Sequence, residues 1–115
     1  MSESIRVTML GTGAALADPD RGHSSILVTA KNQHYLLDIG HGATRQMVRA
    51  NVDPATVNHV FISHLHFDHM DDSAYFLIAS WMANRTVKPK IFGPPGTREF
   101  IDNLLENGAY KLDIA

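Results

Sequence analysis

The sequence predicts an α/β fold in which a mixed sheet is flanked by helices. Three observations support this prediction. Short runs of alternating apolar residues come first, segments with helical periodicity then alternate with further apolar runs, and Gly, Pro and Asp separate the two kinds of segment. The expected order is β-β-β-α-β-α-β-α, which is typical of a sheet that begins as a meander and then acquires covering helices.

The first part of the chain is expected to hold three strands, at residues 5–10, 25–30 and 34–39. In the first of them, Ile5, Val7 and Met9 alternate along the strand and should share one face of the sheet. Residues 11–22 are rich in Gly, Asp and Pro and are expected to form a loop. The polar residues 31–33 should join the second and third strands as a hairpin.

A short helix is expected at residues 43–50, with Met47 and Val48 facing the core. The pair Asp53-Pro54 suits a helix cap followed by proline at the first helical position. One helical turn is therefore expected there, immediately before a fourth strand at residues 58–62.

The rest of the chain should hold two helices and a short strand, at residues 71–84, 97–106 and 89–92. Asp71 or Asp72 can cap the first of these helices. Thr97 should cap the second, and Gly108 should close it. Residues 110–115 resemble the start of a further strand.

Helical spacing selects the side chains of residues 71–84 that should face the core. The expected set is Tyr75, Ile78, Ala79 and Met82 along one face, together with Phe76 and Trp81. Aromatic residues at this spacing are more typical of a core than of a platform for stacking nucleobases.

The composition excludes several classes of protein. The net charge is −2, which excludes the strongly basic surface of a general nucleic-acid binder. There are no cysteines, so disulfides and thiolate metal sites are impossible. No secretory leader and no membrane-spanning run are visible, so the cytoplasm is the expected location. Residues 1–115 are expected to form a single domain.

The segment HLHFDH at residues 64–69 contains three histidines and an aspartate, residue types that bind metal ions. It follows a predicted strand and precedes a predicted helix, which is where α/β sheets place their sites. His64 and His66 lie two residues apart, so both imidazoles can point the same way and share one ion. Asp68 and His69 project differently and suit a second ion, because paired metals in hydrolytic sites lie roughly 3.5–4 Å apart. Imidazole with carboxylate suits zinc, manganese or iron.

Other polar residues near the predicted strand ends are weaker candidates. Asp38 is either a carboxylate that orients a ligand histidine or a plain turn residue. His41 is expected to be a loop histidine, with contact to a cleft as the alternative. His23 and Arg21 are expected to lie on an exposed loop, with contact to an anionic substrate as the alternative.

These segments resemble the metallo-β-lactamase superfamily, in particular its ribonuclease Z, arylsulfatase and phosphodiesterase branch. His64-x-His66-x-Asp68-His69 is similar to the defining motif of that superfamily. Flanking segments that fit the same branch are LGTG at 10–13, LDIG at 37–40, FIS at 61–63 and FGPPG at 92–96. The resemblance extends over about residues 5–100.

The resemblance implies a four-layer αββα sandwich, of which this chain would form the N-terminal half. It implies that His64 and His66 bind one metal ion and that Asp68 and His69 bind a second, with Zn²⁺ expected and Mn²⁺ or Fe as alternatives. The family completes its site with a His, a bridging Asp and a final His further along. The domain is therefore expected to be incomplete, and to form a homodimer or to be completed by a missing C-terminal half.

The resulting hypothesis is a metal-dependent hydrolase of phosphodiester or sulfate ester bonds, acting on a small-molecule ester or on RNA with a binuclear metal-bound hydroxide. Asp68 is the candidate catalytic residue, because its carboxylate can accept a proton from the attacking water. Two alternatives stay open. One is a non-catalytic metal-binding half-domain, and the other is an iron-dependent oxidoreductase of the same superfamily.

Overall fold

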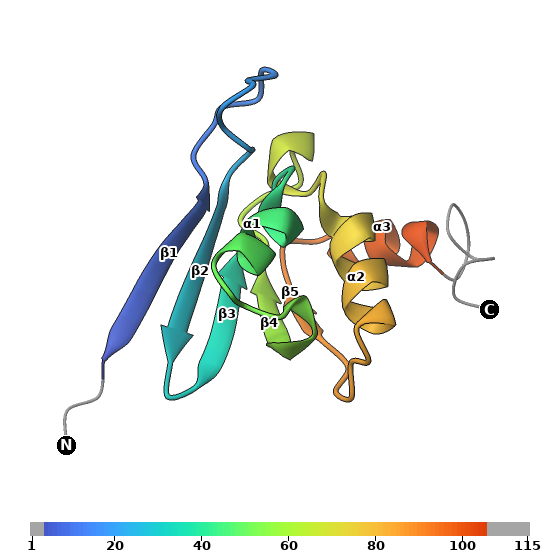
Figure 1. The fold of residues 1–115 in the computed structure, drawn as a ribbon. Coiled ribbons are helices and arrows are strands. Elements are labelled where there is room, and N and C mark those ends of the chain that lie inside the picture. Colours follow the sequence, from blue (N-terminus) through green and yellow to red (C-terminus); the bar gives the residue numbers. More distant parts are fainter. Residues whose placement is uncertain (1–3, 106–115) are drawn as a thin grey trace.

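The computed structural model describes residues 4–105, and its elements follow the expected order (Figure 1). Within these residues the strands are β1 (Ile5–Gly11), β2 (Ser25–Ala30), β3 (Gln33–Leu37), β4 (Val57–Phe61) and β5 (Lys90–Phe92). The helices are α1 (Ala43–Arg49), α2 (Ser73–Met82) and α3 (Thr97–Leu104), and two single 3-10 turns are η1 (Pro54–Thr56) and η2 (Phe67–His69). None of the helices within residues 4–105 has the length and apolar character that a bilayer crossing requires.

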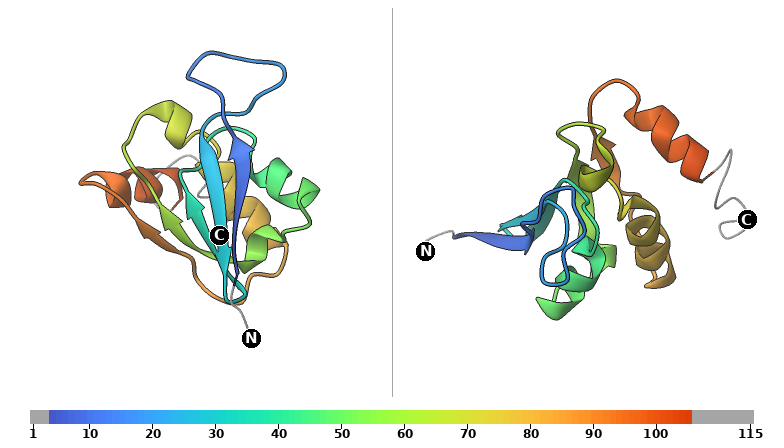
Figure 2. Two further views of the ribbon diagram at one scale, coloured as in Figure 1. Left: turned by 90° about the vertical axis from the view of Figure 1, so that its left-hand side faces the viewer. Right: turned by 90° about the horizontal axis from the view of Figure 1, so that it is seen from above.

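The strands form one mixed sheet in sequence order, as the sequence predicted. β1, β2 and β3 pair antiparallel, whereas β3, β4 and β5 pair parallel. The hairpin between β2 and β3 turns at Lys31 and Asn32, whose φ angles of 51° and 63° suit a tight two-residue hairpin turn. Parallel strands need crossovers, and α1 and α2 supply them from one side of the sheet (Figure 2). The carboxyl ends of β3 and β4 therefore lie side by side.

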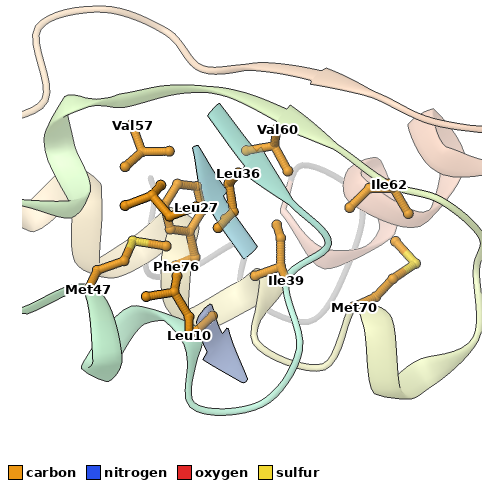
Figure 3. Close-up of a cluster of buried hydrophobic side chains, with 11 residues drawn as sticks. Leu10, Leu27, Leu36, Ile39, Met47, Val57, Val60, Ile62, Met70 and Phe76 are labelled. Atoms are coloured by element: carbon orange, nitrogen blue, oxygen red, sulfur yellow. The ribbon is translucent and has the colours of Figure 1, made fainter. Parts of the chain in front are cut away.

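The core lies between the sheet and these two helices. Alternate residues of the central strands point into it, including Leu27, Leu36 and Val60, which are fully buried. Met47 of α1 and Phe76 of α2 pack against them (Figure 3). Because one contiguous cluster joins the sheet to both crossover helices, it fixes the loops at the carboxyl edge of the sheet.

The opposite face of the sheet is apolar and exposed. Ile5, Val7 and Met9 share this face, as predicted, and all three are exposed. The register pairs Val7 with Val28, and the stacked rings of Phe61 and Phe92 extend the same face across β4 and β5. An exposed apolar sheet face is what remains when one αβ half of an αββα sandwich is viewed alone.

The helical faces differ from the prediction in two places. Val48 of α1 is exposed, although Met47 beside it is buried. In α2 the buried stripe is Ser73, Phe76 and Ser80, spaced by three and four residues. The predicted face is wrong because this helix is apolar on several sides, so spacing alone does not select the stripe that meets the core. Tyr75, Trp81 and Met82 are accordingly exposed.

Element ends also shift by a few residues. β3 stops at Leu37, because Asp38 adopts a φ of 62° that a strand does not allow. Asp53 caps η1 by accepting a hydrogen bond from the Ala55 N–H, as predicted. Thr97 is the first residue of α3 and not its cap, since Gly96 takes the cap position with a φ of 101°. The predictions for Glu106, Gly108 and residues 110–115 lie outside the described residues.

Candidate metal centre

The HLHFDH segment lies at the carboxyl edge of the parallel half of the sheet. It begins three residues after β4 ends at Phe61 and passes through η2 before α2 starts at Ser73. Asp38 follows directly after β3, the parallel neighbour of β4. Since the two strands pair in parallel, both segments emerge at the same edge. The β1–β2 loop reaches this end of the molecule as well (Figure 1).

The four predicted ligand side chains converge. The ring centroids of His64 and His66 lie 4.6 Å apart, and those of His64 and His69 lie 4.0 Å apart. Asp68 joins the group, with its Oδ2 3.5 Å from His69 Nε2. A shared cation would bring imidazoles and a carboxylate together at such separations.

The carboxylate of Asp38 hydrogen bonds to one residue of this cluster and to the residue that precedes the motif. Its side chain is 11% exposed, and its Oδ2 accepts a hydrogen bond of 2.7 Å from His69 Nδ1. Its Oδ1 accepts from the Ser63 backbone N–H at 2.7 Å. With Nδ1 bound to Asp38, His69 directs its Nε2 toward Asp68. The structure thus gives Asp38 the contact expected of a carboxylate that orients a ligand histidine.

Ser63 extends the same network to His64. Its Oγ donates to Asp38 Oδ2 at 2.8 Å, and the same Oγ lies 2.9 Å from His64 Nδ1. A serine hydroxyl has one hydrogen, which is used on Asp38, so Oγ accepts from a proton on His64 Nδ1. His64 therefore presents the lone pair of Nε2. Sequence reasoning missed Ser63, and only its position next to the motif could have drawn attention to it.

Close backbone packing sets the position of Asp68. A Cβ added at Gly40 would lie 2.7 Å from the Asp68 carbonyl oxygen and 2.4 Å from the His23 carbonyl carbon. Only glycine fits where these three segments meet. The Ile39 N–H also donates to the His69 carbonyl at 2.8 Å. The β3–α1 turn is thus the surface on which the ligand loop rests.

Asp72 has a different role from the one predicted. It occupies the N-cap position of α2, but its side chain makes no capping hydrogen bond there. Instead its carboxylate accepts from the backbone N–H of Thr44 at 2.8 Å and from that of Gly42 at 3.3 Å. Asp72 therefore caps α1 across the core, and it ties the start of one crossover helix to the other.

The weaker candidates separate from one another. Arg21 and His41 are exposed, as expected of loop residues. His23 is not exposed, because its side chain is 13% accessible and its Nδ1 pairs with Asp71 Oδ2. Its ring also lies edge-on to Phe67, with centroids 5.9 Å apart. No local sequence pattern indicates this pairing, since His23 and Asp71 are 48 residues apart.

The donor set suits a metal of the zinc, manganese or iron type. Three imidazoles and a carboxylate converge, and two of the imidazoles have their Nδ1 atoms occupied in a way that leaves Nε2 for a ligand role. Among residues 4–105, no three His, Cys, Asp or Glu side chains are arranged as they stand to hold a single ion. The residues present therefore fit a metal in the chemistry of their donors, while their described positions do not form a three-ligand site.

Comparison with known proteins agrees with the fold and with the family resemblance of the sequence. The family model for "Anti-Pycsar protein Apyc1" matches residues 5–113. Ribonuclease Z of Mycobacterium marinum is 39% identical over 113 residues, covering 96% of this chain and 40% of the relative. Ribonuclease Z of Methanococcus aeolicus is 36% identical over 110 residues, covering 96% and 34%. The chain thus spans about 40% or less of these relatives.

Solved structures confirm the architecture. The short form of human tRNase Z superimposes with a TM-score of 0.80 at 33% identity, covering 87% of this chain and 39% of that one. The metallo-β-lactamase fold protein YhfI of Bacillus subtilis gives a TM-score of 0.75 at 21% identity, covering 90% and 42%. The expected fold, part of a ribonuclease Z-like metallo-β-lactamase sandwich, is therefore correct.

Proposed function

Because the chain belongs to the family of the anti-Pycsar protein Apyc1, we propose that it is the metal-binding part of a phosphodiesterase that acts on nucleotides. The match to this family favours a cyclic nucleotide as substrate, and the similarity to ribonuclease Z favours RNA. Both substrates contain a phosphodiester, which is why we prefer this bond to a sulfate ester. The observation behind the proposal is the convergence of His64, His66, Asp68 and His69 above the buried carboxylate of Asp38.

In this proposal His64 and His66 hold one Zn²⁺, and Asp68 and His69 hold the second. The remaining ligands come from further sequence of the same protein or from a second copy. When bound, the ions supply Lewis-acid polarisation of a phosphoryl oxygen and lower the pKa of water. Manganese or iron suits the same donors.

The protein side chains then have distinct tasks. Asp38 keeps the proton of His69 on Nδ1, and Ser63 keeps the proton of His64 on Nδ1, so that both Nε2 atoms are available as ligands. The Asp68 carboxylate, beside His69 Nε2, is placed to hold a proton taken from the attacking water. Asp38 is too enclosed to reach a substrate and acts only through these neighbours.

The test compares His66→Ala with His34→Ala in the full-length protein. His66 is exposed and its side chain makes no hydrogen bond within residues 4–105, so truncating this side chain should leave the fold intact. We expect His66→Ala to lose metal and to lower turnover of bis(p-nitrophenyl) phosphate by on the order of 100-fold or more. His34, on β3 and outside the cluster, should give a variant with normal metal content and turnover.

Elemental analysis, turnover and thermal unfolding of the metal-free form measure these effects. A cyclic mononucleotide, a precursor RNA and p-nitrophenyl sulfate assayed in parallel then identify the substrate class. A His66→Ala protein that keeps both its metal and its turnover would contradict the proposal.

A further inference from the structure

One side chain joins the end of the β1–β2 loop to the ligand loop. His23 Nδ1 donates to Asp71 Oδ2, and the edge of the His23 ring packs against Phe67. Phe67 directly precedes Asp68, and Asp71 lies two residues after His69. His23 therefore contacts the chain on both sides of the two proposed ligands.

The backbone holds His23 firmly in this position. Its N–H donates to the His41 carbonyl at 3.1 Å, and it forms an isolated bridge with Gly13. A Cβ added at Gly22 would lie 2.4 Å from the His41 carbonyl oxygen, and one added at Gly11 would lie 1.8 Å from that of His23. The imidazole is thus presented from a closely packed base that side chains larger than hydrogen would disrupt.

The segment that carries Asp68 and His69 needs such support. η2 is one 3-10 turn of three residues, a structure with few hydrogen bonds of its own. Its carbonyl side rests on the β3–α1 turn through the Ile39 N–H. On its other side Phe67 is largely exposed, and its ring contacts His23. The hydrogen bond between His23 and Asp71 is therefore a side-chain contact that fixes η2 to the end of the β1–β2 loop.

Asp71 has no competing structural task within residues 4–105. The neighbouring Asp72 supplies the cap of α1, and α2 receives no side-chain cap from either aspartate. The one described polar contact of the Asp71 side chain is His23, and this side chain is 24% exposed. A carboxylate held in this way orients an imidazole, and the imidazole in turn fixes the loop to which the carboxylate belongs.

We propose that His23 is a positioning residue for Asp68 and His69: through Asp71 and Phe67 it holds η2 in the geometry that binds the second ion. This inference rests on the proposed function. It assigns His23 no contact with substrate or metal. Its effect appears as weaker binding of one ion and slower turnover, and not as a weaker affinity for substrate.

The experiment uses five variants of the full-length protein: His23→Ala, His23→Asn, His23→Phe, Asp71→Ala and the double variant His23→Ala/Asp71→Ala. Asn keeps a donor near the place of Nδ1 but loses the ring, whereas Phe keeps the ring but loses the donor. For each variant, competition with a chromogenic chelator measures the affinity for each of two Zn²⁺ ions. Turnover of bis(p-nitrophenyl) phosphate gives kcat and KM, and thermal unfolding without metal measures stability.

We expect His23→Ala to lower the affinity for the second ion and to lower kcat, each by about tenfold, with KM nearly unchanged. His23→Asn should recover more of both quantities than His23→Phe. The double variant His23→Ala/Asp71→Ala should be no worse than His23→Ala alone, because the two residues act as a pair.

Two results would overturn the inference. The first is a His23→Ala protein whose thermal stability falls while its affinity for both ions and its kcat stay at wild-type values, which indicates a purely structural contact. The second is better recovery by His23→Phe than by His23→Asn. A wild-type protein that binds no metal is a separate outcome: it removes the proposed function and this inference with it. If His23→Ala does not fold, Asp71→Ala supplies the same comparison.

Discussion

The two ends of β4 carry two polar centres of opposite character. At its amino end, Arg85 uses all five N–H donors on oxygens of the protein. The acceptors are Ser80 Oγ, Asn58 Oδ1 and the carbonyls of Pro54, Val57 and Val87. The guanidinium also lies over the Phe76 ring at 5.6 Å. Nothing in this centre is left to bind a ligand.

At the carboxyl end of β4, by contrast, some side-chain nitrogens are left without a hydrogen bond. His64 and His69 each use Nδ1 on Ser63 or Asp38, and each leaves Nε2 toward the cluster. The side chain of His66 forms no hydrogen bond within residues 4–105. A centre whose polar groups all hydrogen bond within the protein is typical of a structural role. A centre that orients its imidazoles and leaves their Nε2 atoms unpaired is typical of a ligand site.

The surroundings of the two centres differ in charge as well. Burial lowers the pKa of Arg85 from its ordinary value, and the nearby carboxylate of Asp53 partly offsets this effect. The carboxyl end instead gathers Asp38, Asp68 and Asp71 around its imidazoles. At the amino end, neutral oxygens are sufficient to hold the one guanidinium of Arg85. At the carboxyl end, the negative charge of the three aspartates favours the binding of added metal cations.

Arg85→Ala is expected to give the largest effect on stability. It leaves two buried carbonyls and Asn58 without their donor, which should cost about 3 kcal/mol of unfolding free energy. Arg85→Lys should recover only part of this, because one ammonium cannot reach acceptors spread over three segments. Urea unfolding of the metal-free protein measures both values. If Arg85→Ala also weakened metal binding in protein that remains folded, the two ends would not be independent.

The second prediction concerns the carboxyl end. Asp38→Asn keeps a residue that tolerates the φ of 62°, so the β3–α1 turn should survive. It replaces one acceptor oxygen with an NH₂ group that opposes the donors of His69 and Ser63. Affinity for the second Zn²⁺ should fall by on the order of 10-fold to 100-fold, with little change in stability.

Competition with a chelator measures this affinity in the full-length protein. Asp20→Asn, which removes the same charge from the exposed β1–β2 loop, is the matched control and should bind Zn²⁺ as the wild type does. An unchanged affinity in Asp38→Asn would mean that Asp38 supports the fold without orienting His69.

The sequence predicted the fold and the central motif because both depend on local patterns. Alternation located both strands of the β2–β3 hairpin, with the end of β3 misplaced by two residues, and the six-residue motif placed three histidines on one loop. The order of elements then fixed which strand ends meet, since parallel strands joined by a helix bring their carboxyl ends to one edge.

The remaining features depend on contacts between distant segments. His23 meets Asp71 across 48 residues, and Asp72 meets Thr44 across 28, and neither pair has a local signature. The prediction of the buried face of α2 failed for a related reason. The buried positions include the small polar residues Ser73 and Ser80, which hydrophobicity ranks below the exposed Tyr75 and Met82.

The smallest predicted effect concerns His34, which lies at the amino end of β3 beside the Arg85 centre and contrasts with the histidines near carboxylates. Its Nδ1 meets Thr29 Oγ1 at 2.8 Å, and burial, followed by the charge of Arg6, lowers its pKa below 6.5. The unfolded chain therefore takes up this proton first as the pH falls. The contribution of His34 to stability is present above about pH 6.5 and is lost as the pH falls toward its folded pKa. His34→Gln should flatten the pH dependence of the urea midpoint between about pH 7 and 5 by at most one proton. A variant with the wild-type slope would show that this strand histidine is as well solvated in the folded protein as in the unfolded chain.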